Sequence, residues 1–189
     1  MNMAAAQFPA ARHDALACAA ALGARGFSLR IATAEDMSFL RELYGLLRVD
    51  EVNAISWPNT ARQAFLDSQF SLQHHHFVTH YPSTDFFMIE RERASIGRFY
   101  LMRERPYFLV VDIALLPAWR GQGLGTMLLE GSKRLAIETG AMGIDLHVDE
   151  RNAAARQLYT RLGFIQTQQE GPYLGMRWTC ASETQLNTA

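Results

Sequence analysis

An apolar stretch that ends in a glycine-rich turn places the strongest constraint on the fold of this chain. Residues 107–116 read YFLVVDIALL, a nearly continuous apolar run that predicts a central strand buried on both faces. Pro117 ends the run, and WRGQGLG precedes a predicted helix over about 123–139. A strand, a glycine turn and a helix in this order place unpaired backbone N–H groups where an anion is favoured.

The spacing of the glycines excludes two nucleotide-binding motifs. A P-loop needs a lysine directly after its last glycine, but Lys133, the only lysine, lies within the following helix. The spacing of Gly121, Gly123 and Gly125 also differs from the dinucleotide fingerprint GxGxxG. Two interpretations stay open on the glycines alone. One is a tight strand-to-helix connection, and the other is a loop that admits the pyrophosphate of an acyl-CoA close to its backbone.

The remaining hydrophobic patterns predict one α/β domain. Thr33 and Asp36 form a helix-capping signature, and Gly163 has a typical C-cap position. The predicted order is β-α-α-β-β-β-α-β-α-β-β, a mixed sheet whose faces the helices must cover. The other predicted strands are 27–33, 85–91, 95–103, 143–148, 164–169 and 173–178, and the other helices are 33–49, 60–81 and 152–163.

Composition restricts the size and the partners of the protein. A chain of 189 residues with 49% hydrophobic content suits a single domain with a sizeable core. The net charge of -1 gives no field to attract nucleic acid or an anionic membrane, and no apolar run approaches the ~20 residues of a membrane span. Cys18 and Cys180 lie at opposite ends, without the spacing of a disulfide framework, so we expect a cytoplasmic protein.

The alanine-rich start resembles a signal peptide only superficially. It lacks a basic first segment, and Arg12, His13 and Asp14 interrupt its apolar stretch. We therefore expect residues 1–26 to form an N-terminal arm before a domain at 27–180 and a tail at 181–189. A homodimer formed through the arm or the final strands is compatible with the sequence.

Two motifs together resemble the GNAT superfamily of acetyl-CoA-dependent N-acetyltransferases. Arg120, Gly123 and Gly125 match its acetyl-CoA motif [RQ]xxGx[GA]. Asn152 follows a predicted strand, and Tyr159 comes seven residues later, before LGF, as in the family's next motif. The resemblance covers roughly four-fifths of the chain. It implies the GNAT fold, a mixed and mostly antiparallel sheet with splayed central strands flanked by helices.

The resemblance also implies a site for acetyl-CoA. The strands that contain Ile113 and Leu146 would splay apart, and the pantetheine arm would lie between them. Backbone groups of Ile113 and Leu115 would bind this arm, and the Ile113 N–H would polarise the thioester carbonyl. Asn152 would donate or accept a hydrogen bond near the arm. The pyrophosphate would be held by Arg120, Gly121, Gln122, Gly123, Leu124, Gly125 and Thr126.

Acetyl transfer to an amine requires a route for the amine proton, an oxyanion donor and an acid for the leaving thiolate. Tyr159 suits the acid, because a phenol with a pKa of about 10 stays protonated at neutral pH. The alternative is a tyrosine that only packs its ring beside Leu158 and Leu162. Both cysteines lie far from the motifs in sequence, so we expect direct transfer in a ternary complex.

The general base is not evident from the sequence. Many family members have a glutamate at the position of Val111, and strand alternation predicts that Asp112 points to the opposite face. Asp149, Glu150 and His147 lie at or after the next strand, and His147 has a suitable intrinsic pKa. A chain of water molecules is at least as good a candidate as His147.

Two further groups of residues concern a metal ion and the acceptor pocket. His76 and His80 lie at i,i+4 in HHHFVTH, but no other metal-binding cluster accompanies them, so we expect a polar helix end and no metal. We expect the acceptor pocket between the first two helices and the final hairpin. The aromatic residues there are Tyr44, Trp57, Phe65, Phe70 and Tyr173, most of them expected in the core.

These observations favour an N-acetyltransferase that moves the acetyl group of acetyl-CoA to a primary amine. The alternative from another class is a non-catalytic GNAT-like module that binds CoA as a structural ligand or sensor. Val111, in place of a glutamate, supports the module. The glycine loop, Asn152 and Tyr159 support the enzyme.

Overall fold

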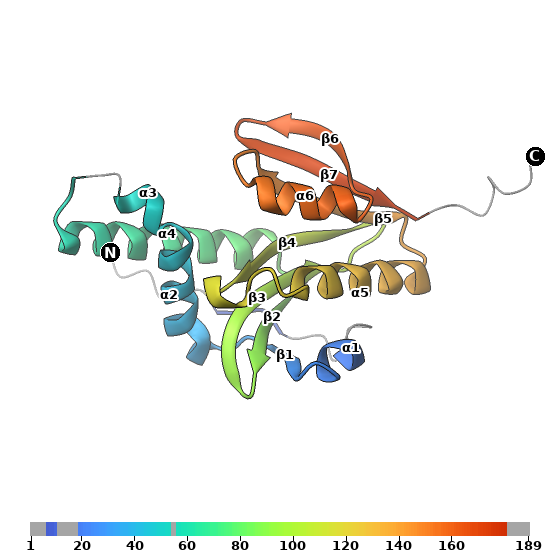
Figure 1. Ribbon diagram of the computed structural model, residues 1–189, viewed down its shortest axis with the longest axis horizontal. Helices are drawn as coiled ribbons and strands as arrows, with labels where there is room; N and C mark the ends of the chain where they lie inside the picture. The colour runs from blue at the N-terminus through green and yellow to red at the C-terminus, as the bar shows by residue number, and fades with distance from the viewer. Residues whose placement is uncertain (1–6, 11–18, 54–55, 181–189) are drawn as a thin grey trace, which may run out of the picture.

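The computed structural model describes residues 7–10, 19–53 and 56–180, which form a seven-stranded sheet with helices on both faces (Figure 1). The strands are β1 (Phe27–Ile31), β2 (Thr84–Arg91), β3 (Ala94–Met102), β4 (Tyr107–Leu115), β5 (Gly143–Asp149), β6 (Ile165–Glu170) and β7 (Tyr173–Thr179). The helices are α1 (Ala19–Gly23), α2 (Met37–Leu47), α3 (Val49–Asn53), α4 (Asn59–His80), α5 (Leu124–Thr139) and α6 (Ala153–Arg161). Two short 3-10 helices are η1 (Ala34–Asp36) and η2 (Pro117–Trp119).

The sheet has the order β1-β2-β3-β4-β5-β7-β6. All adjacent pairs of the described strands are antiparallel except β4 and β5, which run parallel. The predicted mixed, mostly antiparallel sheet is confirmed. Each predicted strand and long helix is present, with ends shifted by one or two residues in most cases.

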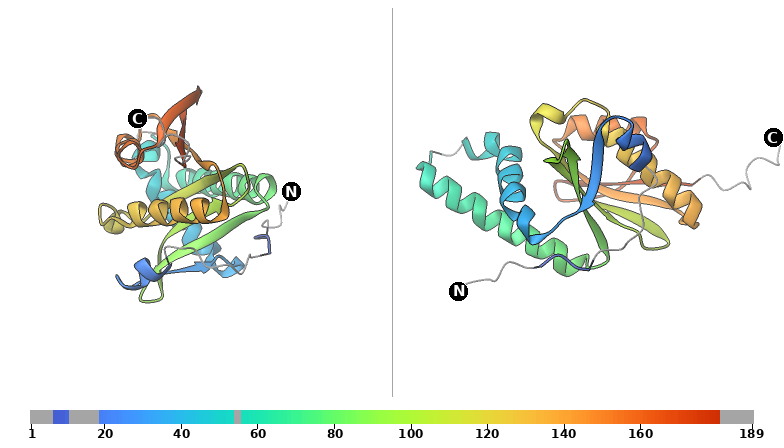
Figure 2. Two further views of the ribbon diagram at one scale, coloured as in Figure 1. Left: turned by 90° about the vertical axis from the view of Figure 1, so that its right-hand side faces the viewer. Right: turned by 90° about the horizontal axis from the view of Figure 1, so that it is seen from below.

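Two hydrophobic cores lie on opposite faces of this sheet. One lies against α1, α5 and α6 and includes Leu22, Leu128 and Tyr159. The other lies against α2 and α4 and includes Leu40 and Phe70. The right-hand view of Figure 2 shows strands between α2 and α4 on one side and α1 and α5 on the other. Each face is therefore covered, as an α/β sheet requires.

The central strands part halfway along their length. Parallel pairing of β4 with β5 runs from Tyr107–Gly143 to Val110–Leu146 and then stops, while β5 continues beside β7. The predicted splay is thus present. The expectation that the whole apolar strand is buried on both faces was wrong, because its second half loses its β5 neighbour and Ile113 and Leu115 are only half-buried.

A β-bulge interrupts β4 where the splay begins. Tyr100 lies opposite Asp112, but Leu101 lies opposite Val110, so Val111 is the extra residue. Val111 packs against the α2–α4 core. Asp112 accepts a hydrogen bond from Arg98, whose guanidinium lies over rings on this same face. The prediction of opposite faces for Val111 and Asp112 was wrong, because a bulge breaks the two-residue alternation of a strand.

The described part of the N-terminal region packs on the domain. Leu22 of α1 is fully buried, and Phe8 contacts the rings of His74 and Phe86. Residues 1–6, 11–18 and 181–189, with Cys18, most of the expected arm and the tail, lie outside the described residues. Within the described part, no helix has the length and apolar character needed to cross a membrane.

Candidate active site

The glycine turn between β4 and α5 has a backbone that only glycine adopts easily. Gly121 and Gly123 have φ angles of +72° and +81°, and Gly123 is the N-cap of α5. The first hydrogen bond of the helix runs from Met127 N–H to the Gly123 carbonyl. The N–H groups of Leu124, Gly125 and Thr126 therefore precede the helical hydrogen bonds and form a site suited to an anion.

Side chains of the turn brace it. Arg120 Nε donates to the Leu115 carbonyl at 3.1 Å, and Gln122 Nε2 donates to the Ala118 carbonyl at 2.8 Å. The Arg120 side chain is exposed, whereas Leu124 is only 1% exposed and lies in the core. Only the backbone of Leu124 can therefore meet a ligand, while Arg120 has further N–H donors available.

The open edge of β4 faces the gap left by β5. The Leu116 N–H donates to Ile96 of β3, whereas the Leu115 carbonyl accepts from Arg120 on the other side. Neighbouring residues of a strand direct their N–H and C=O groups to opposite edges, so Ile113 shares the edge of Leu115. Because pairing with β5 ends at Val110, the Ile113 N–H has no strand partner across the gap.

Helix α6 lies next to the turn and carries Tyr159. The Leu158 Cδ2 atom lies 3.0 Å from the position that a Cβ atom on Gly125 would occupy. Asn152 caps α6, since its Oδ1 accepts from Ala155 N–H at 3.1 Å. Asn152 is exposed at the start of the helix. The sequence carried a signal for this cap, because asparagine is among the preferred N-cap residues.

Tyr159 is buried, with 5% exposure, and its ring packs against Phe164 at 5.9 Å. Burial raises the pKa of the Tyr159 phenol to about 12, and the nearby Asp112 carboxylate adds to this increase. Its hydroxyl makes no hydrogen bond with the described residues. The phenol is therefore protonated at neutral pH and free to donate its proton.

A buried ion pair fixes Asp112 on the α4 side of the gap. Arg98, with 3% exposure, donates from Nε to Asp112 Oδ2 at 2.6 Å and from Nη2 to Gln73 Oε1 at 2.9 Å. Asp112 keeps 23% exposure. The bulge thus places this carboxylate on the α2–α4 face of the sheet, which the sequence pattern did not predict.

Of the histidines considered, His147 lies on a strand that borders the gap, whereas the others lie on α4. His147 is exposed on β5 beyond the end of the pairing with β4 and lies opposite Gly175 of β7. His76 and His80 stack at 4.3 Å on α4, but His74 is buried between aromatic rings, so the expected polar helix end was wrong for His74. Among the described residues, no group of three His, Cys, Asp or Glu side chains is arranged to hold a metal.

The expected acceptor aromatics divide into two groups. Tyr44 and Phe70 are core residues with 4% and 1% exposure. Trp57 and Phe65 are exposed and pack on each other at 5.5 Å, and Tyr173 is also exposed. Burial raises the pKa of the Tyr44 phenol above its usual range.

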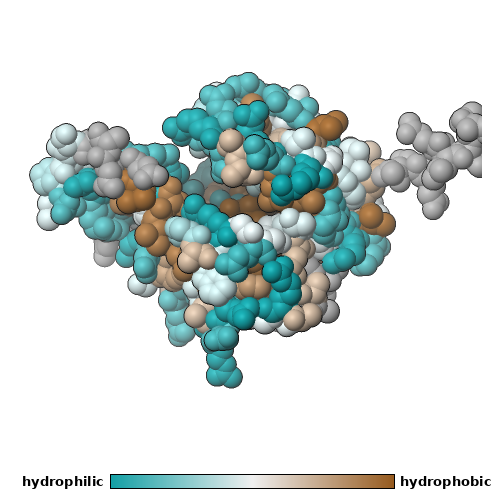
Figure 3. Space-filling view, in the orientation of Figure 1, coloured by the Kyte–Doolittle hydropathy of each residue, from teal (hydrophilic) through white to brown (hydrophobic). Residues whose placement is uncertain are grey.

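A charged rim joins the two sides of this region. Glu51 of α3 pairs with Arg151, which follows β5, at 3.6 Å, and with Arg48 at 3.3 Å. Figure 3 shows the surface hollowed between the part that carries α2 and α3 and the part that carries α6 and the β6–β7 hairpin. Brown, apolar surface lines the floor of the hollow. The surface where we expect the acceptor is therefore an apolar groove with a charged rim.

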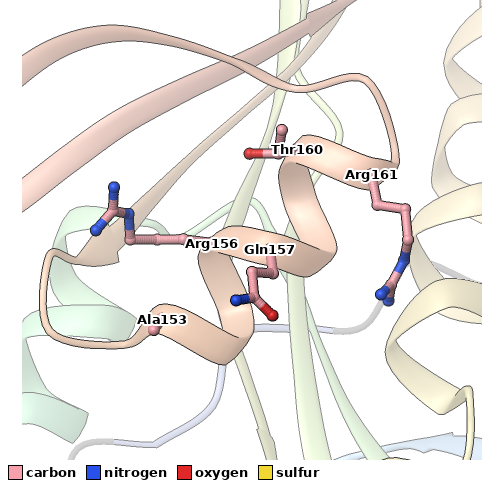
Figure 4. A pocket seen from close by; sticks show the side chains of 5 residues that line it. All are labelled: Ala153, Arg156, Gln157, Thr160 and Arg161. Atoms are coloured by element: carbon pink, nitrogen blue, oxygen red, sulfur yellow. The ribbon is translucent and has the colours of Figure 1, made fainter.

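A second hollow, of about 550 Å³, lies on the outer face of α6. Its residues all belong to α6 (Figure 4), namely Ala153, Arg156, Gln157, Thr160 and Arg161. Figure 4 shows Arg156 and Arg161 pointing in different directions. These side chains do not converge on one point of the hollow.

Most of the chain matches one known protein family. Residues 42–164 match the acetyltransferase (GNAT) family. The chain belongs to the GNAT acetyltransferase family. The matched segment contains the glycine turn, Asn152 and Tyr159, so the resemblance seen in the two motifs is confirmed. No curated protein sequence matches the chain.

Solved structures show the same fold at low sequence identity. The PaiA N-acetyltransferase from Thermoplasma acidophilum, in complex with coenzyme A, has a TM-score of 0.61 at 15% identity and covers 82% of this chain and 99% of its own. An acetyltransferase from Thermus thermophilus gives 0.60 at 17%, covering 82% and 97%. The ribosomal-protein-S18-alanine N-acetyltransferase from Escherichia coli gives 0.57 at 18%, covering 83% and 97%.

Proposed function

We propose that this GNAT protein transfers the acetyl group of acetyl-CoA to a primary amine, by direct attack within a ternary complex. The observation that carries the proposal is the gap between β4 and β5, with the glycine turn at one end and Tyr159 beside it. The gap offers an unpaired strand edge on β4, and the turn offers free N–H groups to an anion. These features match the extended and the charged parts of acetyl-CoA, respectively.

The turn suits the pyrophosphate of the donor. Three N–H groups at the start of α5 and the positive end of the helix favour negative charge. The position of Gly125 matters because a side chain there would fill the space between α5 and α6. In the PaiA structure the bound molecule is coenzyme A, which supports the same class of donor here.

The edge of β4 suits the thioester. The Ile113 N–H faces the gap and has no strand partner there, so it can donate to the carbonyl oxygen as negative charge develops. One such donor is typically worth about 10²- to 10³-fold in rate. We assign this role to the backbone of Ile113 and binding of the pantetheine arm to Ile113, Leu115 and Asn152.

The chemistry needs one proton removed from the amine and one delivered to the thiolate. The amine nitrogen attacks the thioester carbon, the C–N bond forms, and the C–S bond then breaks. Tyr159 donates its proton to the departing sulfur. Asp112 is fixed by Arg98 and partly exposed. Its carboxylate accepts the proton of the amine, directly or through water.

The second candidate function is a CoA-binding module without catalysis. Val111 favours it, because this residue packs into the α2–α4 core and supplies no carboxylate. The two functions differ in one measurable product. With acetyl-CoA and a panel of primary amines, an acetyltransferase releases the CoA thiol, whereas a module binds acetyl-CoA and releases none.

A further inference from the structure

Arg25 lies against the glycine turn although the two are about a hundred positions apart in sequence. Its Nη2 donates to the Gln122 carbonyl at 2.9 Å, and its Nη1 lies 3.2 Å from the Met127 sulfur. The same Nη1 is 3.3 Å from the position of a Cβ atom on Gly123. The guanidinium therefore touches the turn on both sides of the α5 N-terminus.

The segment that carries Arg25 is anchored on the domain. Leu22 is fully buried in the core beside α5, and Phe27 packs edge-on against Trp119 of η2 at 5.9 Å. Between them, the Arg25 carbonyl accepts from Arg91 Nη1 at 2.6 Å. The backbone on each side of Arg25 is thus fixed, so the side chain needs little reorganisation to meet a ligand at the turn.

The charge of Arg25 has no acidic partner among the described residues. It is exposed, and it lies at the end of α5 where the free N–H groups are already partly positive. A cation at this end of a helix is unfavourable unless an anion binds there. Arg120 adds a second exposed guanidinium in the same turn. The described residues therefore leave an uncompensated positive charge around the glycine turn.

We propose that Arg25 is a ligand of the donor's pyrophosphate, supplied by a segment outside the region 42–164 that matches the family. This inference rests on the proposed function, because it assigns a further binding residue to the same donor site. Arg25 bonds the Gln122 carbonyl with one nitrogen and keeps further N–H donors for phosphate oxygens. A guanidinium suits this task because its N–H groups match the geometry of phosphate.

Titration calorimetry of the full chain with CoA tests the proposal. Arg25→Gln removes the charge but keeps a donor group, and Arg25→Lys keeps the charge. Arg134→Gln, on an exposed face of α5, makes the same change in net charge and is the control. At low salt we expect Arg25→Gln to weaken CoA binding roughly tenfold, with Arg25→Lys in between and the control unchanged. The effect should diminish at high salt.

Two further ligands show which part of CoA Arg25 contacts. The pyrophosphate assignment predicts the same roughly tenfold loss with 3′-dephospho-CoA and no loss with acetyl-pantetheine, which lacks the pyrophosphate. A loss confined to CoA would overturn it in favour of the 3′-phosphate. A loss that is independent of salt and accompanied by a lower Tm of the ligand-free protein would overturn it in favour of a structural brace. Equal CoA affinity of Arg25→Gln and wild type would also overturn it, whereas a wild type that binds no CoA would refute the proposed function itself.

Discussion

Leu158 Cδ2 lies 3.0 Å from the place that a Cβ atom on Gly125 would take. This contact joins the first turn of α5 to α6, one residue before Tyr159. The glycine turn and the proposed acid therefore lie close together, with no room for a side chain at Gly125 unless Leu158 moves. A substitution at Gly125 acts on both, because any side chain there must displace Leu158 or enter the space above the free N–H groups.

Gly125→Glu should abolish donor binding. The glutamate places a carboxylate beside N–H groups that we assign to the pyrophosphate, and like charges at such a site cost several kcal/mol. We expect the Kd for CoA to rise at least about 100-fold in titration calorimetry. Gly125→Ala should give a smaller loss, since its methyl group meets the flexible ends of the Leu158 and Ile113 side chains.

Arg134→Glu, an acid placed further along the exposed part of α5, serves as the control for Gly125→Glu and should keep wild-type affinity. Wild-type affinity in Gly125→Glu, with an unchanged fold by circular dichroism, would remove the turn from the donor site.

Tyr159→Phe should reduce kcat by about 10²-fold or more while leaving CoA affinity nearly unchanged. The substitution removes only a hydroxyl that makes no hydrogen bond with the described residues, so folding should be little affected. Steady-state kinetics with acetyl-CoA and a reactive amine measure kcat. The control is Tyr81→Phe, at a half-buried residue directly after α4. An unaltered kcat would mean that Tyr159 has a packing role only.

The raised pKa of Tyr159 predicts a specific dependence of stability on pH. Its pKa is about 12 in the folded protein against an ordinary value of 10.0, so folding favours the protonated phenol. The contribution is fully present below pH 10 and is lost as the pH rises from about 10 to 12, because the unfolded chain loses the proton first. A difference of two pKa units corresponds to roughly 3 kcal/mol.

Urea unfolding at several pH values between 9 and about 12 tests this dependence. The free energy of unfolding of the wild type should fall more steeply than that of Tyr159→Phe over this range. Identical slopes in the two proteins would contradict the burial-induced increase in the pKa of Tyr159.

Asp112→Asn should destabilise the protein because Arg98 stays buried without its counter-charge. Removing one partner of a buried pair typically costs 3–5 kcal/mol, and we expect about 2 kcal/mol here, since Asp112 is 23% exposed and asparagine keeps an acceptor. The matched control is Asp145→Asn, which breaks the more exposed pair with Arg177 and should cost less than about 1 kcal/mol. Equal losses in chemical denaturation would contradict this account of Asp112.

The local elements of the fold were predictable because their signals are local. The apolar run of β4, Pro117, and the glycines of the turn define a strand, a stop and a helix start within about twenty residues. The bulge at Val111 was not predictable, because one extra residue leaves no mark in an apolar run. That residue decides the face on which Asp112 lies.

The contact of Arg25 with the glycine turn could also not be predicted from the sequence pattern. It depends on Leu22 and Phe27 packing on elements about a hundred residues away, and no periodicity encodes such a contact. The cap formed by Asn152 had a visible signal, since an asparagine directly precedes the helical pattern. The resemblance assigned that residue to the donor, while the structure gives its Oδ1 a partner within α6.

Release of the CoA thiol tests directly whether this protein transfers the acetyl group of acetyl-CoA to an amine. The full chain is mixed with acetyl-CoA and a panel of primary amines that includes small metabolites, peptides with free N-termini and lysine-containing peptides. We expect thiol release above background with at least one amine, matched by an equal amount of acetylated amine in mass spectrometry, and a strong loss of both in Tyr159→Phe. Binding of acetyl-CoA without thiol release from any amine would contradict it and support a CoA-binding module.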